Sequence, residues 1–241
     1  MTKRPVRIGF LVPPGNPTCE PEMIRLTPPG VTVHFTRMVA QGPAGSHEGQ
    51  EERNRTQLAH LDENVALLAM VKPDVIVMAH TASSYTLGKQ GEADLVARIE
   101  NSTGTRFITA FGSVLAALAH LGVQRVALGA PYAYEAMLKS KAYLELHGLE
   151  VPGFGNLENV ANIYEETPER ACQLGRKVDV PEAQAVFLSG VGMPTLDMLG
   201  RLERDLGKPV LSSASAMMWH ALRTAGVKTT VEGYGRLLSL P

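Results

Sequence analysis

The chain has 241 residues, a formal net charge of −1, 44% hydrophobic residues and 20% charged residues. This length is enough for a sizeable core, either in one large α/β unit or in two compact lobes. The balanced charge excludes the strongly basic surface that nucleic-acid and membrane-surface binders need, so we expect a small-molecule partner, with no nucleic acid and no membrane.

The N-terminal segment passes from basic residues directly into the strand-like run RIGFLVP, without a separate apolar segment. No stretch of about 18 apolar residues follows anywhere in the chain, and we therefore expect a soluble, cytoplasmic protein. Further short apolar runs begin at residues 31, 74, 106, 125, 185 and 209, and each precedes a turn or an amphipathic segment. This alternation predicts an α/β fold with parallel sheets that helices cover on both faces.

Helix boundaries are also visible in the sequence. Ser46 is expected to cap a helix over residues 51–70, and Thr167 followed by Pro168 is expected to open another. Gly148, directly after His147, is expected to end a third helix. No linker or low-complexity segment divides the chain.

The two halves of the sequence resemble each other in order. RIGFLVPP at 7–14 resembles RVALGAPY at 125–132, and PDVIVMAHTASS at 73–84 resembles AQAVFLSGVGMP at 183–194. The segment 104–123 likewise resembles 207–227. A repeat of half the chain predicts two pseudo-symmetric Rossmann-like lobes, one of residues 1–115 plus 214–241 and one of 116–213, with an active-site cleft between them.

Several motifs resemble known enzymes. PPGNPTCEPE and LTPPGVTVHFTRM resemble the maleate cis-trans isomerase pattern, whereas RVALGAPY, SGVGMPTLDMLGRLERDLGKPVLSS and GYGRLL resemble arylmalonate decarboxylase. Both groups belong to the aspartate/glutamate racemase superfamily, and the resemblance covers nearly the whole chain. It implies a cofactor-free enzyme that acts on a small carboxylate or dicarboxylate and forms a homo-oligomer.

The resemblance also implies two cysteines that face each other across the cleft, and both are replaced in this chain. His80 stands at the first thiol position and Gly190 at the second. Thr81 matches a family residue that helps to bind the carboxylate. A thiol mechanism at these two positions is therefore excluded, and one imidazole remains in a cleft that binds oxyanions.

The remaining residues suggest roles in such a cleft. We expect His80 to be the general acid or base and Tyr132 to assist catalysis, with Thr81 as a further hydroxyl donor. The glycine-rich turn would supply backbone N–H groups for a developing enolate, and Gly190 would leave room for substrate or water. The expected substrate-binding residues are Asn16, Thr18, Thr81, Gly190, Val191 and Gly192.

Each assignment has a purely structural alternative. A histidine at a strand end is often a core residue, Tyr132 suits simple packing, and Asn16 suits a plain Gly-Asn-Pro turn. Cys19 has no basic neighbour in the sequence, so we expect an inert buried thiol. The spacing of Cys19 and Cys172 favours neither a zinc site nor a disulfide.

The sequence leaves the reaction open. Decarboxylation or isomerisation through an enolate keeps the chemistry that the family resemblance implies, whereas hydrolysis by a water that His80 activates is an alternative. A carboxylate-binding protein without catalysis is a second alternative. No HExxH, GxSxG or complete GxGxxG motif occurs, and the acidic residues around His47 are typical of a solvated helix start, so we expect neither metal nor cofactor.

Overall fold

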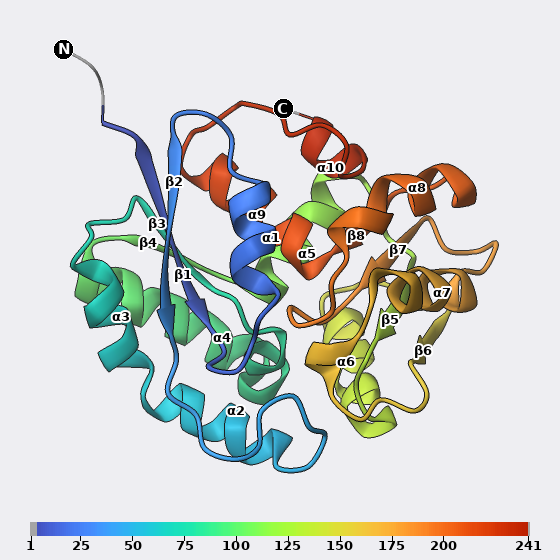
Figure 1. The fold of residues 1–241 in the computed structure, drawn as a ribbon, viewed down its shortest axis with the longest axis horizontal. Coiled ribbons are helices and arrows are strands. Elements are labelled where there is room, and N and C mark those ends of the chain that lie inside the picture. The colour runs from blue at the N-terminus through green and yellow to red at the C-terminus, as the bar shows by residue number, and fades with distance from the viewer. Residues whose placement is uncertain (1–3, 241) are drawn as a thin grey trace.

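The computed structural model describes residues 4–240, which form two four-stranded parallel sheets (Figure 1). The first sheet has the order β2-β1-β3-β4 and the second has the order β6-β5-β7-β8. The strands are β1 (Val6–Val12), β2 (Val31–Arg37), β3 (Val75–Met78), β4 (Arg106–Thr109), β5 (Val126–Ala130), β6 (Phe154–Asn156), β7 (Ala185–Leu188) and β8 (Val210–Ser212). The two orders correspond strand for strand, which confirms the α/β fold with two similar parallel sheets.

Helices connect successive strands, as parallel sheets require, and α9 and α10 follow the last strand. They are α1 (Cys19–Arg25), α2 (Gln50–Ala59), α3 (Leu61–Ala69), α4 (Thr81–Thr103), α5 (Ala110–His120), α6 (Tyr134–Leu146), the short 3₁₀ helix η1 (Ile163–Glu165), α7 (Pro168–Val178), α8 (Leu196–Leu206), α9 (Ser213–Thr224) and α10 (Arg236–Ser239). No helix in the described residues combines the length and the apolar content that a membrane crossing needs.

The predicted helix boundaries are confirmed in part. Thr167 caps α7 by accepting a hydrogen bond from the Arg170 backbone N–H, and Gly148 follows α6 with a φ of +81°. The prediction for Ser46 is wrong, because the residue before α2 is Gly49, which has a left-handed φ of +68°. The predicted helix over 51–70 is broken at His60, so that α2 and α3 are separate helices.

One hydrophobic core runs through both sheets. Phe111 of α5 packs edge-to-face on Tyr143 of α6 at 5.0 Å between ring centroids, and on Phe187 of β7 at 6.1 Å. Helices α1, α5 and α9 lie between the two sheets in Figure 1, and α9 packs against α5. The halves therefore share buried apolar surface and form one compact unit.

A buried carboxylate also joins the two halves. Helix α4 is broken at Gly88, which has φ +71° and ψ +171°. Glu92, beyond this break, accepts hydrogen bonds from the hydroxyls of Ser84 and Thr109 and from that of Tyr143 on α6. Three donors satisfy a carboxylate that is 8% exposed, and the one from Tyr143 holds α4 against the second half of the chain.

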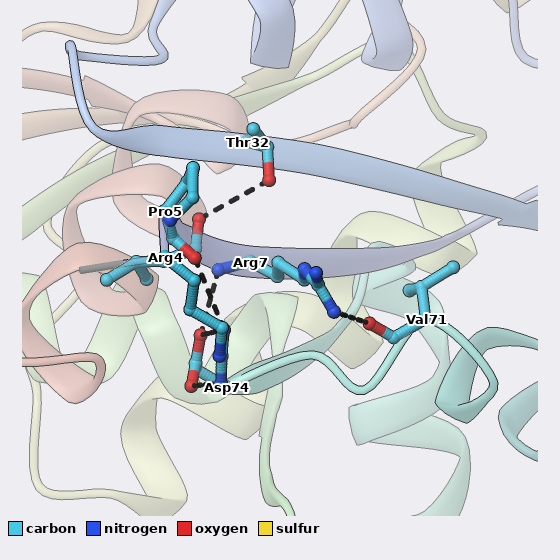
Figure 2. A network of polar contacts seen from close by, with 7 residues as sticks. Arg4, Pro5, Arg7, Thr32, Val71 and Asp74 are labelled. Atoms are coloured by element: carbon cyan, nitrogen blue, oxygen red, sulfur yellow. Dashed lines mark hydrogen bonds and ion pairs between the residues drawn. The ribbon is translucent and has the colours of Figure 1, made fainter. Parts of the chain in front are cut away.

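The start of β1 is tied to the start of β3 (Figure 2). Asp74 accepts two hydrogen bonds from the Arg4 guanidinium, at 2.9 and 2.7 Å, and one from the Arg7 backbone N–H at 2.9 Å. The Arg7 side chain donates to the Val71 carbonyl at 2.8 Å. These contacts lie at the amino ends of the strands, whereas the site is expected at the carboxyl ends. They therefore support the sheet rather than the site.

Candidate active site

A cavity of about 50 Å³ lies where the carboxyl ends of the two sheets meet. Its walls come from the turn after β1, from α2, from the start of α4, from the turn after β5, from η1 and from the turn after β7. The lining residues include Asn16, Arg53, Asn54, Gln57, His80, Thr81, Tyr132, Tyr164, Val191 and Gly192.

His80 follows β3 directly and occupies the position before the first residue of α4, with extended φ and ψ of −147° and +103°. Its Nδ1 lies 2.7 Å from the Ser83 hydroxyl, one turn into the helix. This contact orients the ring, and Nε2 is the nitrogen left to meet a substrate or water. The sequence prediction places His80 in the cleft, and the structure shows its side chain in the cavity wall.

The imidazole of His80 is neutral at physiological pH. Burial and, to a lesser extent, the positive charge of Arg53 lower its pKa from the ordinary value of 6.5 to about 4. At pH 7 about one ring in a thousand is then protonated. A neutral imidazole can accept a proton from a carbon acid or from water, so the site suits general base catalysis.

Thr81 and Tyr132 bring hydroxyls to the cavity from the two halves of the chain. Their oxygens lie 3.4 Å apart, and both side chains are buried. Burial raises the pKa of Tyr132 to about 12, so its hydroxyl keeps its proton and can donate. Hydroxyl donors at this place can stabilise negative charge on a substrate oxygen.

The turn after β7 supplies backbone donors. The N–H groups of Val191 and Gly192 have no acceptor among residues 4–240, and both residues line the cavity. A Cβ on Gly192 would lie 2.6 Å from the Tyr164 ring, so glycine is needed for the close packing of η1 on this turn. Two unpaired N–H groups beside the two hydroxyls give the site the donors that an oxyanion needs.

Gly190 lies behind these donors and outside the cavity lining. Its N–H donates to the Ser213 hydroxyl at 3.2 Å, and its φ is +117°. A Cβ there would lie 3.1 Å from Pro131 and 3.2 Å from the Tyr132 oxygen. The expectation that Gly190 leaves room for substrate is therefore wrong, because Pro131 and Tyr132 take up that space.

Asn16 is oriented by its own turn. Its Oδ1 accepts from the backbone N–H groups of Thr18 and Cys19, at 2.8 and 3.0 Å. The amide Nδ2, a donor, therefore points the other way, toward Gly192 and the cavity. Asn16 can therefore both stabilise its turn and bind substrate, since its Oδ1 serves the turn and its Nδ2 faces the cavity.

Thr18 and Cys19 do not line the cavity. The Thr18 hydroxyl donates to the Gly192 carbonyl at 3.0 Å and so supports the turn from behind. Cys19 is fully buried, and burial together with the negative charges of Glu22 and Glu20 raises the pKa of its thiol. A protonated, inaccessible thiol is no substitute for the missing nucleophiles.

Sequence reasoning missed the contribution of α2 and η1. Arg53, Asn54 and Gln57 of α2 and Tyr164 of η1 complete the cavity wall. The signal in α2 is a row of polar residues at helical spacing, but such a row usually faces solvent. Nothing in the sequence around Tyr164 distinguishes it from an ordinary loop tyrosine. Among residues 4–240, no three metal-ligating side chains form a cluster.

Comparisons with known proteins agree with this architecture. The family model described as arylmalonate decarboxylase matches residues 8–238. The chain is 31% identical to a maleate isomerase of Nocardia farcinica over 96% of this chain and 95% of that protein. It is 33% identical to an arylmalonate decarboxylase of Bordetella bronchiseptica, over 68% of this chain and 70% of that protein.

Solved structures give the same result. The maleate isomerase Iso from Pseudomonas putida S16 superposes with a TM-score of 0.87 at 26% identity, over 97% of this chain and 98% of that chain. An arylmalonate decarboxylase crystal structure superposes with a TM-score of 0.78 at 26% identity, over 98% of this chain and all of that chain.

Proposed function

The chain belongs to the arylmalonate decarboxylase family, and we propose that it transfers a proton next to the carboxylate of a small carboxylate or dicarboxylate. Its similarity to maleate isomerases and to an arylmalonate decarboxylase supports an isomerase or lyase. The observation that carries the proposal is the position of His80 at the end of β3, in the wall of a cavity that also holds the unpaired N–H groups of Val191 and Gly192 and the hydroxyl pair of Thr81 and Tyr132.

In this proposal, Nε2 of His80 removes a proton from the carbon next to the substrate carboxylate. The electron pair of the broken C–H bond moves into that carboxylate and forms an enediolate. The hydroxyls of Thr81 and Tyr132 and the N–H groups of Val191 and Gly192 donate to its oxygens. The imidazolium then returns a proton either to the same carbon, which exchanges it, or to another carbon of a conjugated substrate, which isomerises it, so atoms and charge balance without any further reactant.

The depressed pKa keeps the ring in the form that accepts a proton, whereas decarboxylation needs a group that donates one. Loss of CO₂ leaves a carbanion that must gain a proton, and a neutral imidazole is a poor acid. Hydrolysis is a second candidate, which the same neutral imidazole favours because it can take a proton from an attacking water. The donors would then stabilise a tetrahedral oxyanion instead of an enediolate.

The test is proton NMR in D₂O with maleate, malonate, their monoamides and amino acids as substrates. Wild type is compared with His80→Ala and with His47→Ala as the matched control. His47 is also a partly buried histidine between the two halves, but its Nε2 is paired with the Pro131 carbonyl at 2.9 Å and it does not line this cavity.

We expect solvent deuterium to enter a substrate C–H position in the wild type and in His47→Ala, and not in His80→Ala. Cleavage of an amide that requires His80 would instead establish the hydrolase. Turnover that persists in His80→Ala would contradict a role for the imidazole. Binding of a carboxylate without turnover in any variant would identify a binding protein.

A further inference from the structure

Helix α2 presents one row of polar side chains to the cavity. Gln50, Arg53, Asn54 and Gln57 follow the spacing i, i+3, i+4, i+7, which places them on one helix face, and all four line the cavity. The opposite face carries Glu52 and Arg55, which pair with each other at 2.6 Å on the surface. The proposed reaction uses none of the residues in this row.

Arg53 is the one permanently charged residue in the cavity wall among residues 4–240. Its guanidinium forms no ion pair within the described part of the chain. It donates instead to the carbonyls of Pro43 and Glu48, both at 2.6 Å, and to the carbonyl of Ser46. An arginine has five N–H groups, so one on Nε and one on Nη2 are left without an acceptor.

The absence of an anionic partner is unfavourable for Arg53 in this environment. Burial lowers the pKa of the guanidinium, because a partly desolvated cation lacks the water that would otherwise stabilise it. Carbonyl groups offer partial negative charges only. A carboxylate placed in the cavity would supply both the full opposite charge and the two missing acceptors.

Two buried amides lie beside Arg53. Asn54 and Gln57 are 5% and 3% exposed, and their side chains form no hydrogen bond with the described residues. The Oε1 of Gln57 is completely buried, so the groups that this pair can offer to a carboxylate are the amide donors Nδ2 of Asn54 and Nε2 of Gln57. Buried polar groups are normally satisfied by protein or by water, so unpaired donors in a cavity wall indicate an occupant that accepts hydrogen bonds.

We propose that this row, with Arg53 at its centre, is a specificity-determining subsite that binds a second carboxylate, located on the part of the substrate away from the reacting carbon. Asn54 and Gln57 hydrogen-bond the same end of the substrate, directly or through water. Arg53 is then the residue that selects a carboxylate over an uncharged group of the same shape at this end of the substrate. This inference rests on the proposed function in one respect, namely which of the two carboxylates lies next to the reacting carbon.

The test compares the binding of isosteric pairs, maleate with its monoamide and malonate with its monoamide, by isothermal titration calorimetry. The amide has the size of the carboxylate but lacks its charge. All proteins carry His80→Ala, so that binding is measured without turnover. On this background we compare Arg53 with Arg53→Gln, Arg53→Lys and the control Arg55→Gln on the exposed face of the same helix.

With Arg53 present, we expect the dianion to bind about ten- to a hundredfold more tightly than its monoamide, the range for a hydrogen-bonded charge pair. Arg53→Gln should bring this ratio to about one, Arg53→Lys should keep part of it, and Arg55→Gln should leave it unchanged.

Three outcomes would overturn the subsite. The ratio could be close to one with Arg53 present, or it could survive Arg53→Gln. Arg53→Gln and Arg53→Lys could also weaken both members of each pair equally, which would show that Arg53 only supports the segment 43–48. Because binding is measured, failure of His80 as the catalytic base would leave this result unaffected.

Discussion

The hydroxyl oxygen of Tyr132 lies 3.4 Å from that of Thr81, across the boundary between the two halves of the chain. Two hydroxyls in contact share one of their hydrogens and leave the other free to point elsewhere. The pair therefore offers the substrate one oriented donor, to which each half of the molecule contributes.

This pairing predicts that Tyr132→Phe and Thr81→Val have effects that do not add. Loss of the hydroxyl that donates to the substrate should lower kcat by about 10²- to 10³-fold, as removal of an oxyanion donor does, whereas loss of its partner should cost less, because the donor stays but is no longer oriented. The double variant should be little slower than the slower single variant, because the one oriented donor is already lost there. Steady-state kinetics of the four proteins tests this, and a product of the two single losses in the double variant would contradict it.

The pH dependence of the proposed reaction follows from the depressed pKa of His80. The neutral ring is the active form, so kcat/KM should fall as the pH falls, with a midpoint near 4 instead of 6.5. In Arg53→Gln, the midpoint should rise but stay below 6.5, because burial, the larger cause of the shift, is unchanged. A wild-type midpoint at 6.5 would show that the ring is solvated during catalysis.

Substitution of Gly190 by cysteine should not restore a thiol enzyme. The backbone has φ +117°, and a Cβ would contact Pro131 at 3.1 Å and the Tyr132 oxygen at 3.2 Å. We expect Gly190→Cys and Gly190→Ala to lower the free energy of unfolding by about 1–3 kcal/mol, measured by urea denaturation. Gly88→Ala is the matched control, since Gly88 has φ +71° but no neighbour within 4 Å. Equal losses at both positions would mean that the contacts around Gly190 cost nothing.

The environment of Glu22 predicts that the free energy of unfolding depends on pH. Its Oε1 accepts from the N–H groups of Thr195 and Leu196 at the start of α8, whereas Oε2 is buried without a partner. Burial is the main cause that raises its pKa from 4.5 to about 7. The folded state thus holds a proton that the unfolded chain releases above pH 4.5.

The sign follows from this difference. The contribution of Glu22 to stability is fully present below pH 4.5 and is lost as the pH rises to about 7. Glu22→Gln lacks this dependence, so it should gain about 1–3 kcal/mol relative to wild type between pH 4.5 and 8. Urea denaturation at both pH values measures the gain. A constant difference would show that folding does not shift the pKa of Glu22.

Much of the fold could be read from the sequence because its signals are local or repeated. Continuous apolar runs predict parallel strands, and the similarity of 7–14 to 125–132 predicts that β1 and β5 occupy the same place in two equivalent sheets. Parallel strands end at one edge, so the residues that follow them, His80 and Tyr132 among them, were expected at the cleft.

Tertiary structure decided what these residues can do. Burial and the charge of Arg53, 27 positions earlier in the chain, lower the pKa of His80. This shift depends on how α2 packs against α4, and periodicity within α2 gives no information on that packing. Gly190 looked like open space in the sequence, but Tyr132 from another turn fills it. Strand and helix patterns are encoded over a few residues, whereas burial, charge and free volume at a site depend on every segment that meets there.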